Sequence, residues 1–171
     1  MAISMYKASA PIFLQFLTAL SANLDKAKAY ADARKIDDAT MLNLRIFPDM
    51  FPLVRQVRSA CDHAGGSCAR LAGLEPLSFA NDEATIADLK ARCTKVIDFI
   101  KGLKPAQIDG SDDREIVLKS PTREMRFTGL NYLLNFAMPN FYFHNTTAYD
   151  ILRSVGVDVG KMDFMGKPVQ S

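Results

Sequence analysis

The feature that most constrains the fold is a helical pattern of apolar residues between positions 130 and 155. Apolar side chains recur there every three or four positions, which is the spacing of one face of an α-helix. His144 falls on that face and Asn140 lies one turn before it, so both polar side chains are expected to point inward. The pattern predicts a long helix with a polar pair set into its buried stripe. The apolar members of the stripe are Leu130, Leu133, Leu134, Ala137, Phe141, Ala148, Ile151, Leu152 and Val155.

Three further segments share this helical spacing. They are residues 9–33, residues 53–71 and a segment that Asn81 or Asp82 would cap and that ends near residue 103. A glycine pair in the middle of the second segment indicates either close approach of a neighbouring helix or a local weak point, because glycine costs about 1 kcal/mol relative to alanine inside a helix. The chain therefore has the pattern of four amphipathic helices.

The period changes between residues 114 and 128, where two short alternating runs flank Ser120-Pro121-Thr122. Such a pattern predicts a β-hairpin, which must pack on the helices to be stable. Residues 157–171 show no period and are expected to form a surface tail. We therefore expect one domain over residues 1–171 with an all-α architecture, a four-helix bundle with a short β-hairpin inserted between the third and fourth helices.

Composition excludes several classes of partner. The 171 residues carry a formal charge of only +2, which argues against a nucleic-acid partner. No run approaches the roughly 18 apolar residues of a membrane span, so no membrane partner is expected. Cys61, Cys68 and Cys93 contain no Cys-x-x-Cys spacing and are expected to be buried, reduced thiols, which favours a cytoplasmic protein.

The aromatic residues of the last segment suggest an interface between copies of the chain. Phe136 and Phe143 lie to one side of the buried stripe, and Tyr142 lies opposite it. A helix covered on more than one face fits a homodimer, since aromatic residues are enriched at interfaces.

The chemistry-bearing residues are few, and each has a structural alternative. His144 could be a metal ligand, a general base or a core histidine held by one hydrogen bond. Gln56 lies at the flank of the second helix's buried stripe and could reach inward, whereas His63, on the same line, is expected to be exposed or at the rim. Pro139 removes a helical hydrogen bond one turn before His144, so a kink is expected there.

Two runs of residues resemble a known group of proteins. The run Asn140-Phe-Tyr-Phe-His-Asn-Thr-Thr-Ala-Tyr-Asp-Ile-Leu-Arg153 is similar to the last-helix motif of the DinB and YfiT superfamily of helical-bundle metalloenzyme-like proteins. Taken with Pro48-Asp-Met-Phe-Pro-Leu-Val-Arg-Gln-Val-Arg58, it resembles more closely an uncharacterised branch known as a domain of unknown function. The resemblance covers nearly the whole chain. It implies an up-down-down-up bundle, for which the second-to-third connection must travel the length of the bundle.

The resemblance also implies where a site should lie. In the superfamily two histidines on the last helix and one on the second hold a divalent metal. His144 matches the second of the pair, Asn140 stands where the first would be, and Gln56 stands where the second-helix histidine would be. Because amides are poor ligands for zinc or nickel, we expect these three residues to form a metal-free polar pocket that binds a small molecule.

Two other functions remain open at this point. The chain could be a divalent-metal-dependent thiol transferase or hydrolase, using Zn or Ni, in which His63, Asp49 or Asp62 supplies the missing ligand and Gln56, Asn140 and His144 the remainder. It could also be a pure interaction protein. The sequence does not decide whether the protein is an enzyme.

Overall fold

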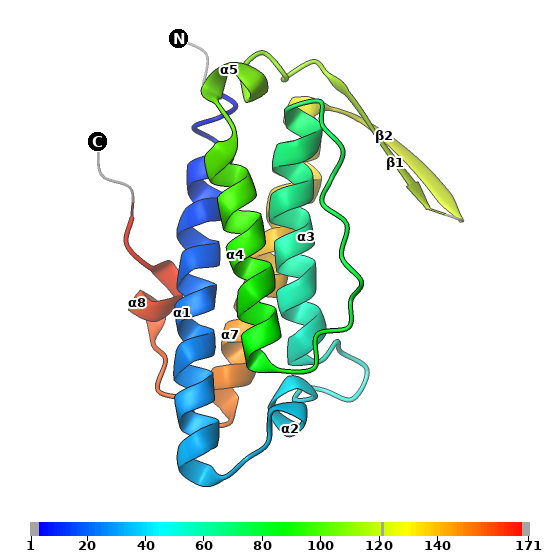
Figure 1. Ribbon diagram of the computed structural model, residues 1–171. Coiled ribbons are helices and arrows are strands. Elements are labelled where there is room, and N and C mark those ends of the chain that lie inside the picture. Colours follow the sequence, from blue (N-terminus) through cyan, green and yellow to red (C-terminus); the bar gives the residue numbers. More distant parts are fainter. Residues whose placement is uncertain (1–3, 121, 169–171) are drawn as a thin grey trace.

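The computed structural model describes residues 4–120 and 122–168, so Pro121 of the expected turn and residues 169–171 of the expected tail lie outside the described residues. The expected mostly helical fold with a small antiparallel hairpin is confirmed. The longest helices lie side by side and enclose the hydrophobic core (Figure 1). They are α1 (Ala10–Arg34), α3 (Leu53–Leu71), α4 (Ile86–Gly102) and α7 (Met138–Ser154).

The remaining helical elements are short. A single turn, α2 (Asp38–Leu42), joins α1 to α3, and α5 (Pro105–Ile108) follows α4. The last long helix is preceded by α6 (Gly129–Tyr132) and the π-helical segment η1 (Leu133–Ala137), and the chain continues to α8 (Lys161–Met165).

Helices α3 and α4 run in the same direction, because the link between them returns along the side of α3 (Figure 1). The link comprises residues 72–85, which can span about 46 Å when extended. The 19 residues of α3 are about 28 Å long. The expected cap at Asn81 or Asp82 would begin α4 three or four residues earlier and shorten the link, whereas the observed link is longer than α3 when extended.

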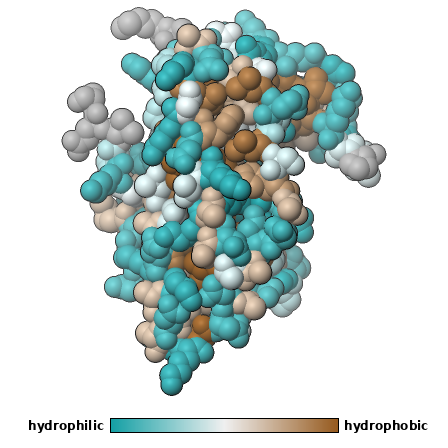
Figure 2. Space-filling model, viewed as in Figure 1, coloured by the Kyte–Doolittle hydropathy of each residue, from teal (hydrophilic) through white to brown (hydrophobic). Residues whose placement is uncertain are grey.

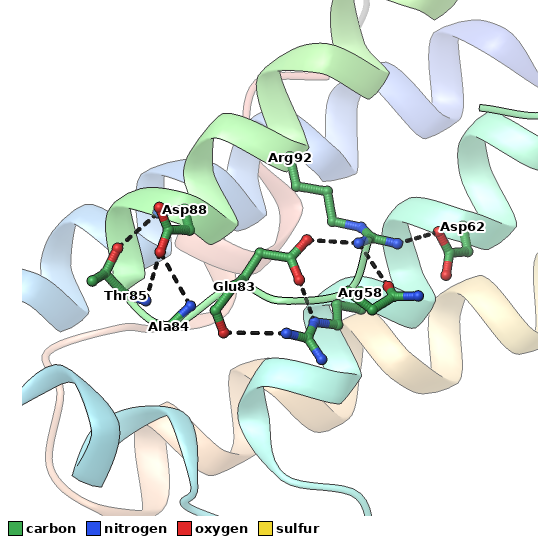
Figure 3. A network of polar contacts seen from close by, with 8 residues as sticks. Arg58, Asp62, Glu83, Ala84, Thr85, Asp88 and Arg92 are labelled. Carbon is green, nitrogen blue, oxygen red and sulfur yellow. Dashed lines mark hydrogen bonds and ion pairs between the residues drawn. The ribbon is translucent and has the colours of Figure 1, made fainter. Parts of the chain in front are cut away.

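A buried arginine fastens this link to both helices (Figure 3). Arg92 of α4 is 3% exposed and donates to Glu83 and Asp62 at 2.6 Å and to Asn81 at 2.9 Å. Arg58 of α3 pairs with the second carboxylate oxygen of Glu83 at 2.5 Å. The link is therefore an extended segment held by charge-assisted hydrogen bonds.

The expected cap of α4 at Asn81 or Asp82 is wrong. Thr85 is the N-cap, and its hydroxyl accepts from the Asp88 N–H while the Asp88 carboxylate accepts from the Thr85 N–H (Figure 3). This reciprocal pair is a capping box. Asn81 instead lies in the link with a positive φ of 60°, and its side-chain oxygen accepts a hydrogen bond from Arg92.

The hairpin pairs β1 (Glu115–Ser120) with β2 (Arg123–Thr128) in antiparallel register, with Val117 opposite Arg126. It projects from the end of the molecule at which α3 ends (Figure 1). Its exposed side chains form alternating ion pairs, including Arg126 with Glu115 at 2.9 Å and with Glu124 at 2.6 Å. Paired charges along such an edge discourage strand pairing between molecules.

The last long helix differs from its expected pattern at its start. The segment η1 ends at Ala137, two residues before Pro139, which has no N–H to donate. A π-turn contains one residue more than an α-turn. That extra residue rotates the preceding turns, so Tyr132 is buried whereas Leu130 and Leu134 are exposed. The expectation that these two leucines face the core is therefore wrong.

The segment after α7 is more ordered than expected for a surface tail. Helix α8 packs on α1, and Phe164 lies edge-on to Phe16 with ring centroids 5.3 Å apart. The Asp163 carboxylate accepts from the Gly160 N–H, which starts the helix, and pairs with Lys26. Aromatic packing therefore stabilises a helix that is too short to show a period.

Figure 2 shows hydrophobic side chains gathered on the upper part of the visible face, near the ends of α3 and α4 and the base of the hairpin, whereas most of the rest is hydrophilic. Within the described ranges, no helix has both the length and the apolar character that crossing a bilayer requires.

Candidate functional site

A hydrogen bond between α3 and α7 joins two of the expected site residues. The Nδ1 atom of His144 lies 2.7 Å from the side-chain oxygen of Gln56. The Gln56 amide nitrogen donates to the backbone carbonyl of Phe51 at 3.1 Å, which orients the amide so that its oxygen faces the imidazole. An amide oxygen only accepts, so Nδ1 carries the proton and Nε2 of His144 is left with a lone pair.

Two flat rings lie almost parallel to the His144 imidazole. The Phe51 ring is tilted by 3° with its centroid 6.3 Å away, and the His63 ring by 13° with its centroid 5.6 Å away. Phe51 precedes the first turn of α3, whereas His63 lies about 15 Å along the helix axis from its first residue. The two rings therefore approach His144 from opposite directions along α3. The Phe143 ring lies edge-to-face with the His144 imidazole, and their ring centroids are 5.3 Å apart.

The surroundings keep both imidazoles neutral at physiological pH. Burial, and then the positive charge of Arg55, lower the pKa of His144 below its ordinary value. Burial lowers the pKa of His63 to about 4, with further contributions from His144 and Arg70. A neutral imidazole with a protonated Nδ1 can accept a proton or a hydrogen bond, or bind a metal, through Nε2.

The other candidate residues lie apart from this hydrogen bond. Asn140 is half-buried and its amide donates to the Phe136 carbonyl at 2.7 Å, one turn back in its own helix. Asp62 is held by Arg92 at the α4 side of α3, and Asp49 is exposed before α3 begins. The structure thus brings together Gln56, His144 and His63.

The sequence reasoning missed the part that His63 and Phe51 play. His63 is half-buried, which fits the expected rim position, and it also touches both His144 and Phe136, whose ring centroid is 5.9 Å away. A signal was present, because His63 follows Gln56 by seven residues, which is two helical turns on one face. The spacing did not indicate which face of α7 contacts Gln56 and His63.

The donor set does not fit a tightly bound transition metal. Between residues 4–120 and 122–168, no group of three or more histidine, cysteine, aspartate and glutamate side chains lies close enough to hold an ion. Gln56, at the position implied for a histidine ligand, instead uses its oxygen to hold the His144 ring. A hydrogen bond to the second nitrogen of a histidine orients that histidine, and the residue that makes the bond is not itself a metal ligand.

Comparisons with known proteins agree on the family. Residues 5–165 match the family model described as a domain of unknown function, DUF1993. The chain is similar to the crystal structure of a DinB family member protein from Shewanella denitrificans, at 36% sequence identity and a TM-score of 0.86, over 97% of this chain and 94% of that one. No curated protein matches the sequence. The chain therefore belongs to the DUF1993 family of uncharacterised, DinB-like helical proteins.

Proposed function

We propose that this protein binds a small molecule at the Nε2 edge of His144, in a polar site that needs no metal. Gln56 orients the ring, and Asn140, whose amide is bonded within its own helix, lies one turn before His144 at the border of the site. The observation that carries the proposal is the chain of hydrogen bonds from the Phe51 carbonyl through Gln56 to His144. It holds one tautomer of a neutral ring and leaves the lone pair of Nε2 able to accept a hydrogen bond from a ligand. A preorganised acceptor of this kind is typical of a binding site.

The surroundings indicate the chemical class of the ligand. Nε2 of His144 accepts a hydrogen bond, and the rings of Phe51 and Phe143 beside it are partly exposed. A ligand that combines a hydroxyl or thiol donor with an aromatic or apolar body satisfies both features. Arg55, whose guanidinium lies 3.5 Å from the centre of the Phe51 ring, adds positive charge at the rim.

A thermal-shift comparison of phenol, thiophenol and toluene tests the proposal. Phenol and thiophenol should raise the unfolding temperature more than toluene, which has the same ring without a strong donor. The difference should disappear in His144→Leu and Gln56→Leu and persist in Asn135→Ala, whose exposed amide donates to the Asn131 side chain. Equal shifts for the three compounds, or the same difference in all variants, would refute it.

The second candidate is a divalent-metal-dependent thiol transferase or hydrolase. It is favoured by one observation, the proximity of His63 to His144, which places two neutral imidazoles side by side. Elemental analysis of protein purified without a histidine tag distinguishes the two functions. We expect well under one equivalent of zinc, nickel or iron, whereas a stoichiometric metal that is lost in His144→Ala would establish the second candidate.

We also propose that α1, α3, α4 and α7 constitute a DinB-like four-helix bundle with the hairpin inserted between its third and fourth helices, forming one domain over residues 1–171. The three cysteines are buried free thiols, which supports a cytoplasmic location. Limited proteolysis tests the single domain, which should yield no stable fragment shorter than the bundle. Cell fractionation tests the cytoplasmic location.

A homodimer is proposed from the exposed apolar side chains of the last helical region. Leu134 and Phe143 are 52% and 57% exposed, and Leu130 is 44% exposed one turn before Leu134. Sedimentation velocity should give a dimer that Leu134→Glu dissociates, whereas Leu77→Glu, at an exposed leucine of the α3–α4 link, should leave it intact. A monomeric wild-type protein at micromolar concentration would exclude this interface.

A further inference from the structure

Two of the three cysteines meet in the core between α3 and α4. The sulfur atoms of Cys61 and Cys93 are 3.6 Å apart, and both residues are completely buried. They come from different helices and lie 32 positions apart in the chain. This contact is independent of the Gln56–His144 hydrogen bond, which lies between α3 and α7.

Small side chains bring the two helix backbones close together at this level. A Cβ atom placed on Gly65 would lie only 3.1 Å from Cγ1 of Val96. Gly65 lies one turn after Cys61 and Val96 nearly one turn after Cys93, so the close approach of the backbones extends to the cysteine pair. A disulfide needs such proximity, because its Cα atoms must lie within about 7 Å of one another.

Cys61 is one of the residues around a cavity that has room for a small oxidant. Cys61 and Gly65 help to line a cavity of about 280 Å³ that lies beneath the α3–α4 link, together with Phe79 and Arg92. One water molecule needs on the order of 10–15 Å³ of such space. Hydrogen peroxide, which has two oxygen atoms, therefore fits within the cavity.

We propose that Cys61 and Cys93 are a site of reversible oxidation, at which peroxide converts the two thiols into a disulfide that crosslinks α3 to α4. In the first step Cys61 sulfur attacks a peroxide oxygen. An S–O bond forms and the O–O bond breaks, so sulfur is oxidised to sulfenic acid and the departing oxygen leaves as water. In the second step Cys93 sulfur attacks Cys61 sulfur, the S–O bond breaks, and a second water leaves with the Cys93 proton.

The surroundings make this reaction slow but selective. The hydrogen bond that the Cys61 thiol shares with Cys93, and burial, raise the pKa of Cys61 well above its ordinary value, so little reactive thiolate is present at neutral pH. Oxidation should therefore accelerate as the pH is raised from 7 to 9. Cys68 lies two turns beyond Cys61, about 10 Å along α3, so it cannot join Cys93 as Cys61 does and should remain a thiol. Burial also raises its pKa, to about 12.

Peptide mapping of the folded full-length protein tests the proposal. After exposure to millimolar hydrogen peroxide and denaturation, titratable thiols should fall from three to one, and trypsin without reductant should release residues 59–70 joined to residues 93–95. Because residues 59–70 contain both Cys61 and Cys68, the same link must also form in Cys68→Ser. The oxidised protein should melt at a higher temperature, since the crosslink closes the loop between the two cysteines.

Two results would overturn the assignment. One is the retention of three thiols while circular dichroism shows the wild-type fold to be intact. The other is equal thiol loss in Cys93→Ser, or a link only between molecules. Should Cys93→Ser fail to fold, the peptide map of Cys68→Ser decides, because residues 59–70 then contain Cys61 as their one cysteine.

Discussion

The lowered pKa of His63 predicts that the protein loses stability as the pH falls below 6.5. The pKa is about 4 in the folded protein against 6.5 as the ordinary value. Because the unfolded chain then binds more protons than the folded one, stability rises with pH across this window. The contribution of neutral His63 is complete above pH 6.5 and is lost progressively as the pH falls towards 4.

The size of the effect follows from the two pKa values. Between pH 6.5 and 5.0 the free energy of unfolding should fall by about 1.5 kcal/mol through His63, and the complete shift corresponds to about 3 kcal/mol. Both are upper values, because the half-buried ring is partly screened by solvent. His144 adds a change of the same sign, since burial and Arg55 also lower its pKa.

Urea unfolding of the EDTA-treated protein at half-unit steps between pH 5.0 and 7.0 measures this dependence. His63→Gln cannot take up the proton, so the difference in stability between wild type and variant should change by up to about 1.5 kcal/mol over the window. His144 remains in both proteins and cancels to first order. Parallel stability curves, or an NMR titration of His63 near pH 6.5, would refute the reasoning.

Three substitutions test the packing that positions the site, each by urea unfolding. Thr85→Ala should cost about 1 kcal/mol by removing the α4 capping box, while Thr85→Ser should cost much less; equal losses would contradict the role of the hydroxyl. Arg92→Met should cost about 3 kcal/mol because it removes a buried cation from the carboxylates of the link, and an unchanged stability would show that the network contributes nothing net. Gly129→Ala should cost at least about 2 kcal/mol, since its Cβ would overlap the Ser111 carbonyl oxygen, whereas Gly102→Ala meets open space and should be neutral or stabilising; the reverse order would contradict the packing.

The helices that the sequence predicted well are those whose burial follows a single period. Residues 9–33 and 53–71 agree with α1 and α3 within one or two positions. The residues of the third segment that recur at helical spacing are all buried, namely Ile86, Leu89, Cys93, Val96, Ile97, Ile100 and Leu103. The sequence also contains a signal for the α4 cap, because Thr85 and Asp88 have the spacing of a capping box. Asn81 and Asp82 compete for the same role in sequence, and only the contact of Asn81 with Arg92 across the fold excludes it as the cap.

The sequence indicated candidate residues but not the geometry between them. Periodicity placed His144 on the buried face of the last helix and Gln56 at the flank of the second helix's buried stripe, and the resemblance paired them. The hydrogen bond between them, and the stacking of His63 on His144, depend on how α3 and α7 face one another. The π-turn before Pro139 also changes which side chains of the last helix are buried, because one extra residue rotates the preceding turns without altering the apolar count.

The sequence by itself determined the helical elements, the hairpin and the family, because hydrophobic period, turn residues and local motifs are properties of neighbouring positions. Only the tertiary structure decided which polar atoms meet. The tautomer of His144, the burial of His63 and the contact between Cys61 and Cys93 each require two helices to be placed to within an ångström or two. Hydrogen bonds and desolvation depend on such small distances between helices, and the spacing of residues within one segment does not specify how two segments are placed.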